Sequence, residues 1–158
     1  FILILDSNKN ILNTLKSRCI KFNFFLTYEK TIDITNTITN SNIFELINPD
    51  IIHYYNSPGH YINLINFSNK YNIDLKNTDL KKFIIHLIDN SYYIKDNFIS
   101  VCIYQYLEFF LLKMLNRNNS IKLNLLYKRF IEKIFNMHKY NLDKESFFIE
   151  VRSKIFNG

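Results

Sequence analysis

The first five residues, Phe1 to Leu5, are all apolar, with no alternation of polar and apolar side chains. Such a run is typical of a strand buried on both faces, as in the parallel sheet of an α/β domain. A parallel sheet needs more strands than this chain can supply, because a helical pattern takes over after Leu26. The sequence therefore predicts that the chain begins inside a domain and is the C-terminal part of a longer protein.

The composition predicts a folded, cytoplasmic protein. Hydrophobic residues make up 47% of 158 residues, which is ample for a buried core. The many Asn, Ile, Lys, Phe and Tyr residues share A/T-rich codons, so mutational bias explains the aromatic content without a role in stacking on nucleic-acid bases. The net charge of +6 permits phosphate contacts but does not require them, since the basic residues are scattered. The two cysteines, Cys19 and Cys102, form no disulfide framework, which fits a reducing compartment.

One apolar segment, from Phe98 to Leu115, is long enough to raise the question of a membrane span. Gln105, Glu108 and Lys113 interrupt it, and the two ionisable residues would be costly in hydrocarbon. We therefore expect a helix that is buried in protein on most sides.

The chain divides into three zones, and the expected fold class is mainly α. Residues 1–25 read as the end of an α/β domain, with a second strand expected from Lys21 to Leu26. Residues 26–75 read as a domain of short helices, and residues 76–158 as a bundle of four helices, by the spacing of their apolar residues. The expected helices are 28–38, 43–47, 49–55, 58–67, 80–88, 96–116, 123–135 and one that starts at Asp143.

Capping residues mark several of these helix starts. Ser57-Pro58 offers a hydroxyl at the N-cap and a proline at the first helical position, where its missing N–H costs nothing. Asn48-Pro49 predicts a helix start in the same way, and Thr78-Asp79 predicts one before Leu80.

Two short motifs carry a family resemblance. Thr14-Leu15-Lys16-Ser17-Arg18-Cys19, after the first apolar run, and Asn56-Ser57-Pro58-Gly59, at a helix start, resemble motifs of the clamp-loader branch of the AAA+ proteins. Elsewhere the resemblance rests on the order of the helices. It implies that the three zones are the end of an AAA+ α/β domain, a helical lid and a helical collar that holds a ring of subunits together.

The resemblance implies a role for Ser17, Arg18 and Cys19. In that family a Ser-Arg-Cys turn presents its arginine across a subunit boundary, as a finger for the neighbour's ATP. A planar, permanently charged guanidinium suits a transferring phosphoryl group, and lysine substitutes poorly for it. The small neighbours of Arg18 would allow a close approach, and we expect Cys19 to be a buried packing thiol.

Two departures distinguish the chain from the ATP-hydrolysing members of the family. Those members carry a threonine-like sensor where this chain has Asp6, and a lid arginine where it has Gly59. A carboxylate repels phosphate and glycine carries no charge. We therefore expect no cofactor on this chain, with ATP held by the neighbouring subunit. Asp6 could instead simply begin the turn, and Gly59 could relieve crowding beside Pro58.

The implied function is that of a non-hydrolysing clamp-loader subunit. Its partners would be the other clamp-loader subunits, of the gamma/tau and delta types, and, through the complex, the sliding clamp and primed DNA. Phe109 and Phe110, on the apolar helix, are expected to be exposed aromatics of the assembly surface, with ordinary intramolecular core as the alternative for both. Two alternatives stay open: an ATP-hydrolysing gamma/tau-type subunit, which an upstream phosphate loop would favour, and a helical nucleic-acid-binding module.

No further catalytic or metal site is expected. His53, His60, His86 and His138 lack metal-ligand spacing with cysteines or carboxylates. No serine, histidine and acid form a hydrolase arrangement, and no glycine-rich phosphate loop is present in the sequence.

Overall fold

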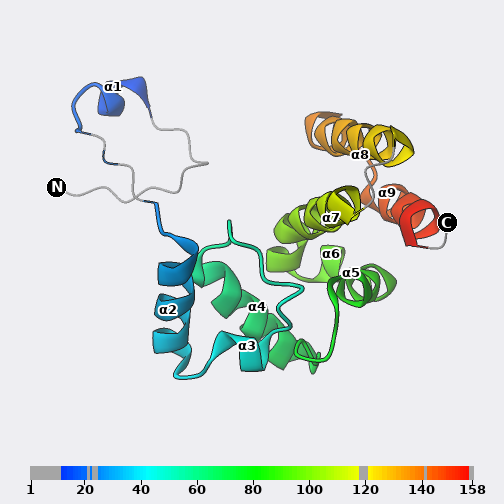
Figure 1. Cartoon of the computed structure of the whole chain (residues 1–158). Helices are drawn as coiled ribbons and strands as arrows, with labels where there is room; N and C mark the ends of the chain where they lie inside the picture. The colour runs from blue at the N-terminus through cyan, green and yellow to red at the C-terminus, as the bar shows by residue number, and fades with distance from the viewer. Residues whose placement is uncertain (1–11, 21, 23–24, 118–120, 141, 157–158) are drawn as a thin grey trace.

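The computed structural model describes residues 12–20, 22, 25–117, 121–140 and 142–156. Within these ranges every regular element is helical, as Figure 1 shows. The expectation of a mainly α protein is therefore confirmed. The expected first strand and Asp6 lie outside the described residues.

The N-terminal segment contains one short helix, α1 (Asn13–Lys16). The second strand, expected from Lys21 to Leu26, is wrong for the described part of that run, which has no regular structure. Ile20 is 84% exposed and Phe25 is 88% exposed. A strand needs backbone partners, and the described residues offer this run no neighbouring strand.

Three helices follow, α2 (Tyr28–Thr39), α3 (Ile43–Leu46) and α4 (Pro58–Tyr71). α2 packs on both of the others. The predicted N-cap at Ser57 is confirmed, because its side chain accepts a hydrogen bond from the backbone N–H of His60. α2 and α4 both end at an asparagine in the left-handed conformation, Asn40 and Asn72, a role that asparagine fills better than most residues.

The helix expected at residues 49–55 is wrong, since this segment forms turns. The reason lies in Asn48, whose side-chain oxygen accepts from the N–H of Asp50 at 2.9 Å, while its carbonyl accepts from Ile51 at 2.9 Å. An asparagine side chain that bonds two residues ahead stabilises a turn. This turn leaves the side chain of Asp50 at the boundary between the two helical zones.

The predicted helix starts in the third zone are confirmed at α5 (Leu80–Asp89) and α9 (Lys144–Val151), which are capped by Asp79 and Asp143. Between them lie α6 (Tyr92–Lys95), α7 (Asn97–Arg117) and α8 (Ile121–Tyr140). A π-helical turn, η1 (Arg152–Phe156), follows α9. The sequence pattern does not predict α6 or η1. Both are too short for the spacing of their apolar residues to show a helical period.

α7 is the central helix of this zone. Among the described residues it is the one helix long and apolar enough to cross a membrane by length and composition. It packs against α5, α6 and α8, however, and its buried side chains include Ile99, Ile103 and Leu107. These contacts bury part of the helix, and 44% of its most apolar 18-residue stretch is buried, so the expected burial on most sides is met only in part.

The two helical zones share one hydrophobic core, which extends from Ile32 in α2 to Phe156 in η1. Polar contacts also cross the predicted boundary after residue 75: the N–H of Leu80 donates to Oδ2 of Asp50 at 2.9 Å. The division into lid and collar stays a prediction. The described helices of residues 26–117 nevertheless contribute side chains to one hydrophobic core.

Candidate functional site

Ser17, Arg18 and Cys19 form a turn at the end of α1. The N–H of Arg18 donates to the carbonyl of Leu15 at 3.1 Å. The hydroxyl of Ser17 donates to the carbonyl of Thr14 at 3.1 Å. These two bonds satisfy carbonyl groups that a helix end leaves without partners. The tripeptide thus has a defined local geometry, with Arg18 in a turn.

The side chains of Arg18 and Cys19 are both exposed. No ion pair joins Arg18 to another residue that the structure describes. Arg18 is solvent-exposed within the described part of the chain. The prediction that Cys19 is a buried packing thiol is wrong, because its described neighbours Ile20 and Phe22 join no hydrophobic core. Cys102 is the buried thiol instead, and burial raises its pKa to about 12.

Gly59 lies in the first turn of α4, directly after Pro58. Its φ is not positive, and a Cβ added to it would meet only the hydroxyl of Ser57, at 3.9 Å. That distance is an ordinary van der Waals contact, and the idea that this glycine relieves crowding beside Pro58 stays a prediction. Beyond its chain neighbours, the position has room for a Cβ.

Asp50 is the polar centre of the junction between the two zones. Its Oδ2 accepts a hydrogen bond from the N–H of Leu80, the first residue of α5, at 2.9 Å. Lys113 of α7 donates from Nζ to Oδ1 of Asp50 and to its main-chain carbonyl, at 2.7 Å each. One carboxylate therefore connects the turn before α4 to the start of α5 and to α7.

The surroundings of Asp50 favour its charged form. Partial burial alone would raise its pKa, but the bonds from Lys113 and Leu80 and the charges of Lys113 and Arg117 hold the pKa below its ordinary value. The ammonium group of Lys113 also lies 4.4 Å from the centre of the Phe109 ring, a cation–π geometry. Phe109 is only 8% exposed, so the prediction that it is an exposed assembly residue is wrong. Its ring packs against that of His53, with 4.2 Å between the ring centres.

A second polar contact joins α4 to α7 inside the core. Nε2 of His60 lies 2.8 Å from the hydroxyl of Tyr106, and the two share a hydrogen bond. Burial, and to a smaller extent the charge of nearby His53, lowers the pKa of His60 to about 4. His60 is therefore neutral at pH 7 and acts as a structural residue.

Sequence reasoning missed Asp50 and His60. It treated Asp50 as part of a helix start and found only that His60 lacks metal-ligand spacing with cysteines or carboxylates. Lys113 offered a usable signal, since a lysine within an apolar helix requires a carboxylate nearby. Nothing local in the sequence indicated that this carboxylate would be Asp50, which lies 63 positions earlier.

The described residues contain no cluster of three His, Cys, Asp or Glu side chains that could hold a metal ion. The predictions that this chain binds neither metal nor cofactor stay predictions.

No protein-family model matches this chain, and searches of curated proteins and of solved structures found no significant similarity.

Proposed function

We propose that this chain belongs to a clamp-loader subunit of the delta-prime type of bacterial DNA polymerase III. In this role it hydrolyses no ATP itself. It lends Arg18 to the ATP site of a neighbouring subunit while the ring places a sliding clamp on primed DNA. The proposal also assigns residues 26–75 to the lid, residues 76–158 to the collar, and the protein to the cytoplasm.

The observation that carries the proposal is the state of Arg18. It lies in a turn that closes the short helix α1, between two small residues, and its side chain is exposed. A finger that acts on a neighbour's nucleotide needs a guanidinium that its own chain does not neutralise. The succession of helices after Arg18 agrees in kind with a lid and a collar.

A gamma/tau-type ATPase is the competing proposal. In such a subunit an arginine stands where this chain has Gly59, so the glycine favours the non-hydrolysing role. Equilibrium dialysis of the full-length subunit with ATP separates the two. We expect no magnesium-dependent turnover, and micromolar binding with turnover would establish the ATPase instead.

The decisive experiment replaces Arg18 in the assembled ring. Arg18→Ala should leave the subunit folded and able to assemble, yet lower ATP hydrolysis stimulated by clamp and DNA by at least about 10³-fold at the site that Arg18 serves. Arg18→Lys should recover little of the rate, because an ammonium lacks the planar fork of donors.

Lys30→Ala is the matched control, since it removes an exposed positive charge from α2 and should leave hydrolysis unchanged. Gel filtration must show an intact ring for every variant. Full ATPase activity of Arg18→Ala in such a ring would refute the proposal.

A further inference from the structure

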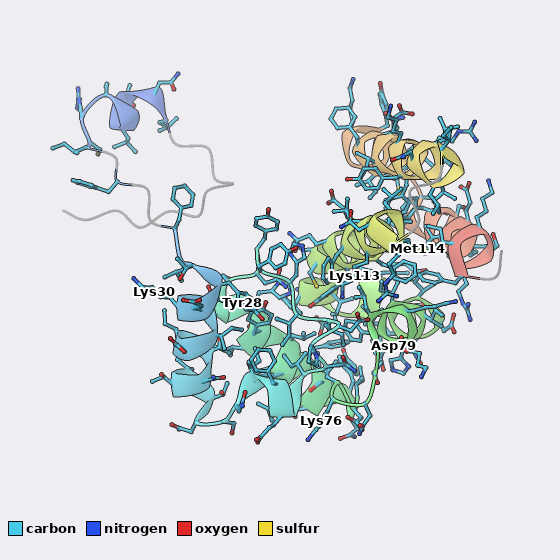
Figure 2. The ribbon with its side chains drawn as sticks, viewed as in Figure 1. Tyr28, Lys30, Lys76, Asp79, Lys113 and Met114 are labelled. Atoms are coloured by element: carbon cyan, nitrogen blue, oxygen red, sulfur yellow. The ribbon has the colours of Figure 1, made fainter. Side chains whose placement is uncertain are left out.

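A cavity of about 470 Å³ lies between the start of α5 and the C-terminal half of α7. Asp79, Lys113 and Met114, which Figure 2 labels, are among the residues that line it. The residues that line the cavity come from three segments: Asp50, Asp79, Lys81, Phe110, Lys113, Met114 and Arg117.

Some charged side chains in this cavity have a partner of opposite charge among the described residues, and others do not. Asp50 is engaged by Lys113, at 2.7 Å. Asp79 accepts from the N–H of Lys82 at 2.7 Å and also pairs with the ammonium group of Lys82 at 3.5 Å. Both carboxylates are therefore satisfied within the chain.

Lys81 and Arg117 are the two cations that remain. Both are exposed, and neither forms an ion pair with a residue that the structure describes. They lie on different helices, α5 and α7, so they flank the cavity from two elements. Two such cations suit an acidic ligand, because each can pair with an incoming carboxylate without losing a partner of its own.

The apolar side chains in the cavity place a second requirement on any ligand that fills it. Phe110 and Met114 are half-buried and line the same cavity. Methionine is a flexible, polarisable side chain that adapts to apolar partners. An occupant that satisfies the whole cavity therefore carries an acidic group next to an apolar one.

We propose that this cavity docks a short acidic segment of a partner protein, in which an Asp or Glu beside a Leu or Phe pairs with Lys81 and Arg117 while the apolar side chain packs on Phe110 and Met114. Nucleic acid fits less well, because it carries a charge at every nucleotide while Lys81 and Arg117 are the two cations in this lining without an ion-pair partner among the described residues. The proposal is independent of the clamp-loader assignment, since it concerns this chain without its ring.

The chain provides its own probe for the test. It has two methionines, Met114 in the cavity and Met137 in α8, where Met137 is 6% exposed. Methyl-13C-methionine labelling thus gives one reporter and one internal reference. The full chain is titrated with the blocked peptide Gly-Ser-Leu-Asp-Glu-Phe-Ser-Gly, and the methionine methyl signals are followed by NMR. We expect the Met114 signal to shift with saturation while the Met137 signal stays in place.

Charge-reversal variants test whether Lys81 and Arg117 are the cations that pair with the peptide. Arg117→Glu or Lys81→Glu should weaken peptide binding about tenfold or more, as expected for loss of a charge-assisted pair. Lys128→Glu makes the same charge change on exposed α8, outside the cavity, and should leave the affinity within about twofold. A peptide with Asn-Gln in place of Asp-Glu should also bind at least about tenfold more weakly.

Two results would overturn the proposal. One is an unmoved Met114 signal at millimolar peptide, with all variants folded by circular dichroism. The other is an equal or larger shift with inorganic phosphate or a short oligothymidylate, which would make the cavity a general anion or nucleic-acid site.

Discussion

The ammonium group of Lys113 donates to both the carboxylate and the main-chain carbonyl of Asp50, at 2.7 Å each. The first bond is an ion pair, and the second anchors the backbone of the turn before α4. Both side chains are about one-third exposed. This contact, with the Asp50–Leu80 bond, attaches the first helical zone to the second.

Replacing Asp50 should destabilise the protein. Asp50→Ala removes the acceptor for the N–H of Leu80 and leaves Lys113 without its charged partner. Hydrogen bonds to charged groups contribute roughly 1.5–3 kcal/mol, and partial exposure reduces that amount. We expect the free energy of unfolding to fall by about 1–2 kcal/mol in urea titrations followed by circular dichroism.

The control for this prediction is Lys82→Ala. Its ion pair with Asp79 is mostly exposed to solvent, and pairs of this kind contribute roughly 0–1 kcal/mol. If Lys82→Ala proved as damaging as Asp50→Ala, the junction would have no special role in stability.

His60 should make the protein sensitive to mild acid. Its pKa is about 4 in the folded protein, against an ordinary value of 6.5. Between these values the unfolded chain binds a proton that the folded chain does not, so the free energy of unfolding falls as the pH falls from 6.5 to 4. The full difference corresponds to about 3 kcal/mol. Urea titrations at pH 7, 6, 5 and 4 measure this slope.

The variant His60→Gln distinguishes the contribution of His60 to acid sensitivity from that of the carboxylates. Glutamine can still bond to the hydroxyl of Tyr106 but takes up no proton. The variant should show a flatter dependence of stability on pH between 6.5 and about 4. A slope equal to that of the unaltered protein would assign the acid sensitivity to other groups.

Phe109 should behave as a core residue. Phe109→Ala removes a ring that packs against His53 and lies beneath the ammonium group of Lys113, which should cost about 3 kcal/mol or more. Val101→Ala, on the same helix but at a side chain 71% exposed, should change stability by less than about 0.5 kcal/mol. Thermal unfolding compares the two variants. If both variants lost the same small amount of stability, Phe109 would not be a core residue.

Gly59→Ala should stabilise the protein. The site has a backbone conformation open to any residue and space for a Cβ. Alanine restricts the unfolded chain more than glycine does, so we expect a gain of about 0.4–1 kcal/mol in the free energy of unfolding. If calorimetry showed a lower stability for Gly59→Ala, the start of α4 would need glycine for a reason that its contacts do not show.

The sequence by itself located most helices, because the signals for them are local. The caps at Ser57, Asp79 and Asp143 act within three residues, and the apolar stripe of α5 repeats along a single helix. The failure at residues 49–55 was also local in origin. Asn48 and Pro49 are compatible with both a helix start and a turn, and the side chain of Asn48 bonded in the manner of a turn.

Tertiary structure decided which side chains meet. Asp50 finds Lys113 63 positions away, and His60 finds Tyr106 46 positions away. No periodicity or capping rule encodes such pairs, because they depend on how whole helices pack. The same packing buried Phe109 and left Cys19 in solvent. The sequence determined where the helices begin and which faces are apolar, and the free energy of packing those faces together selected the polar contacts between them.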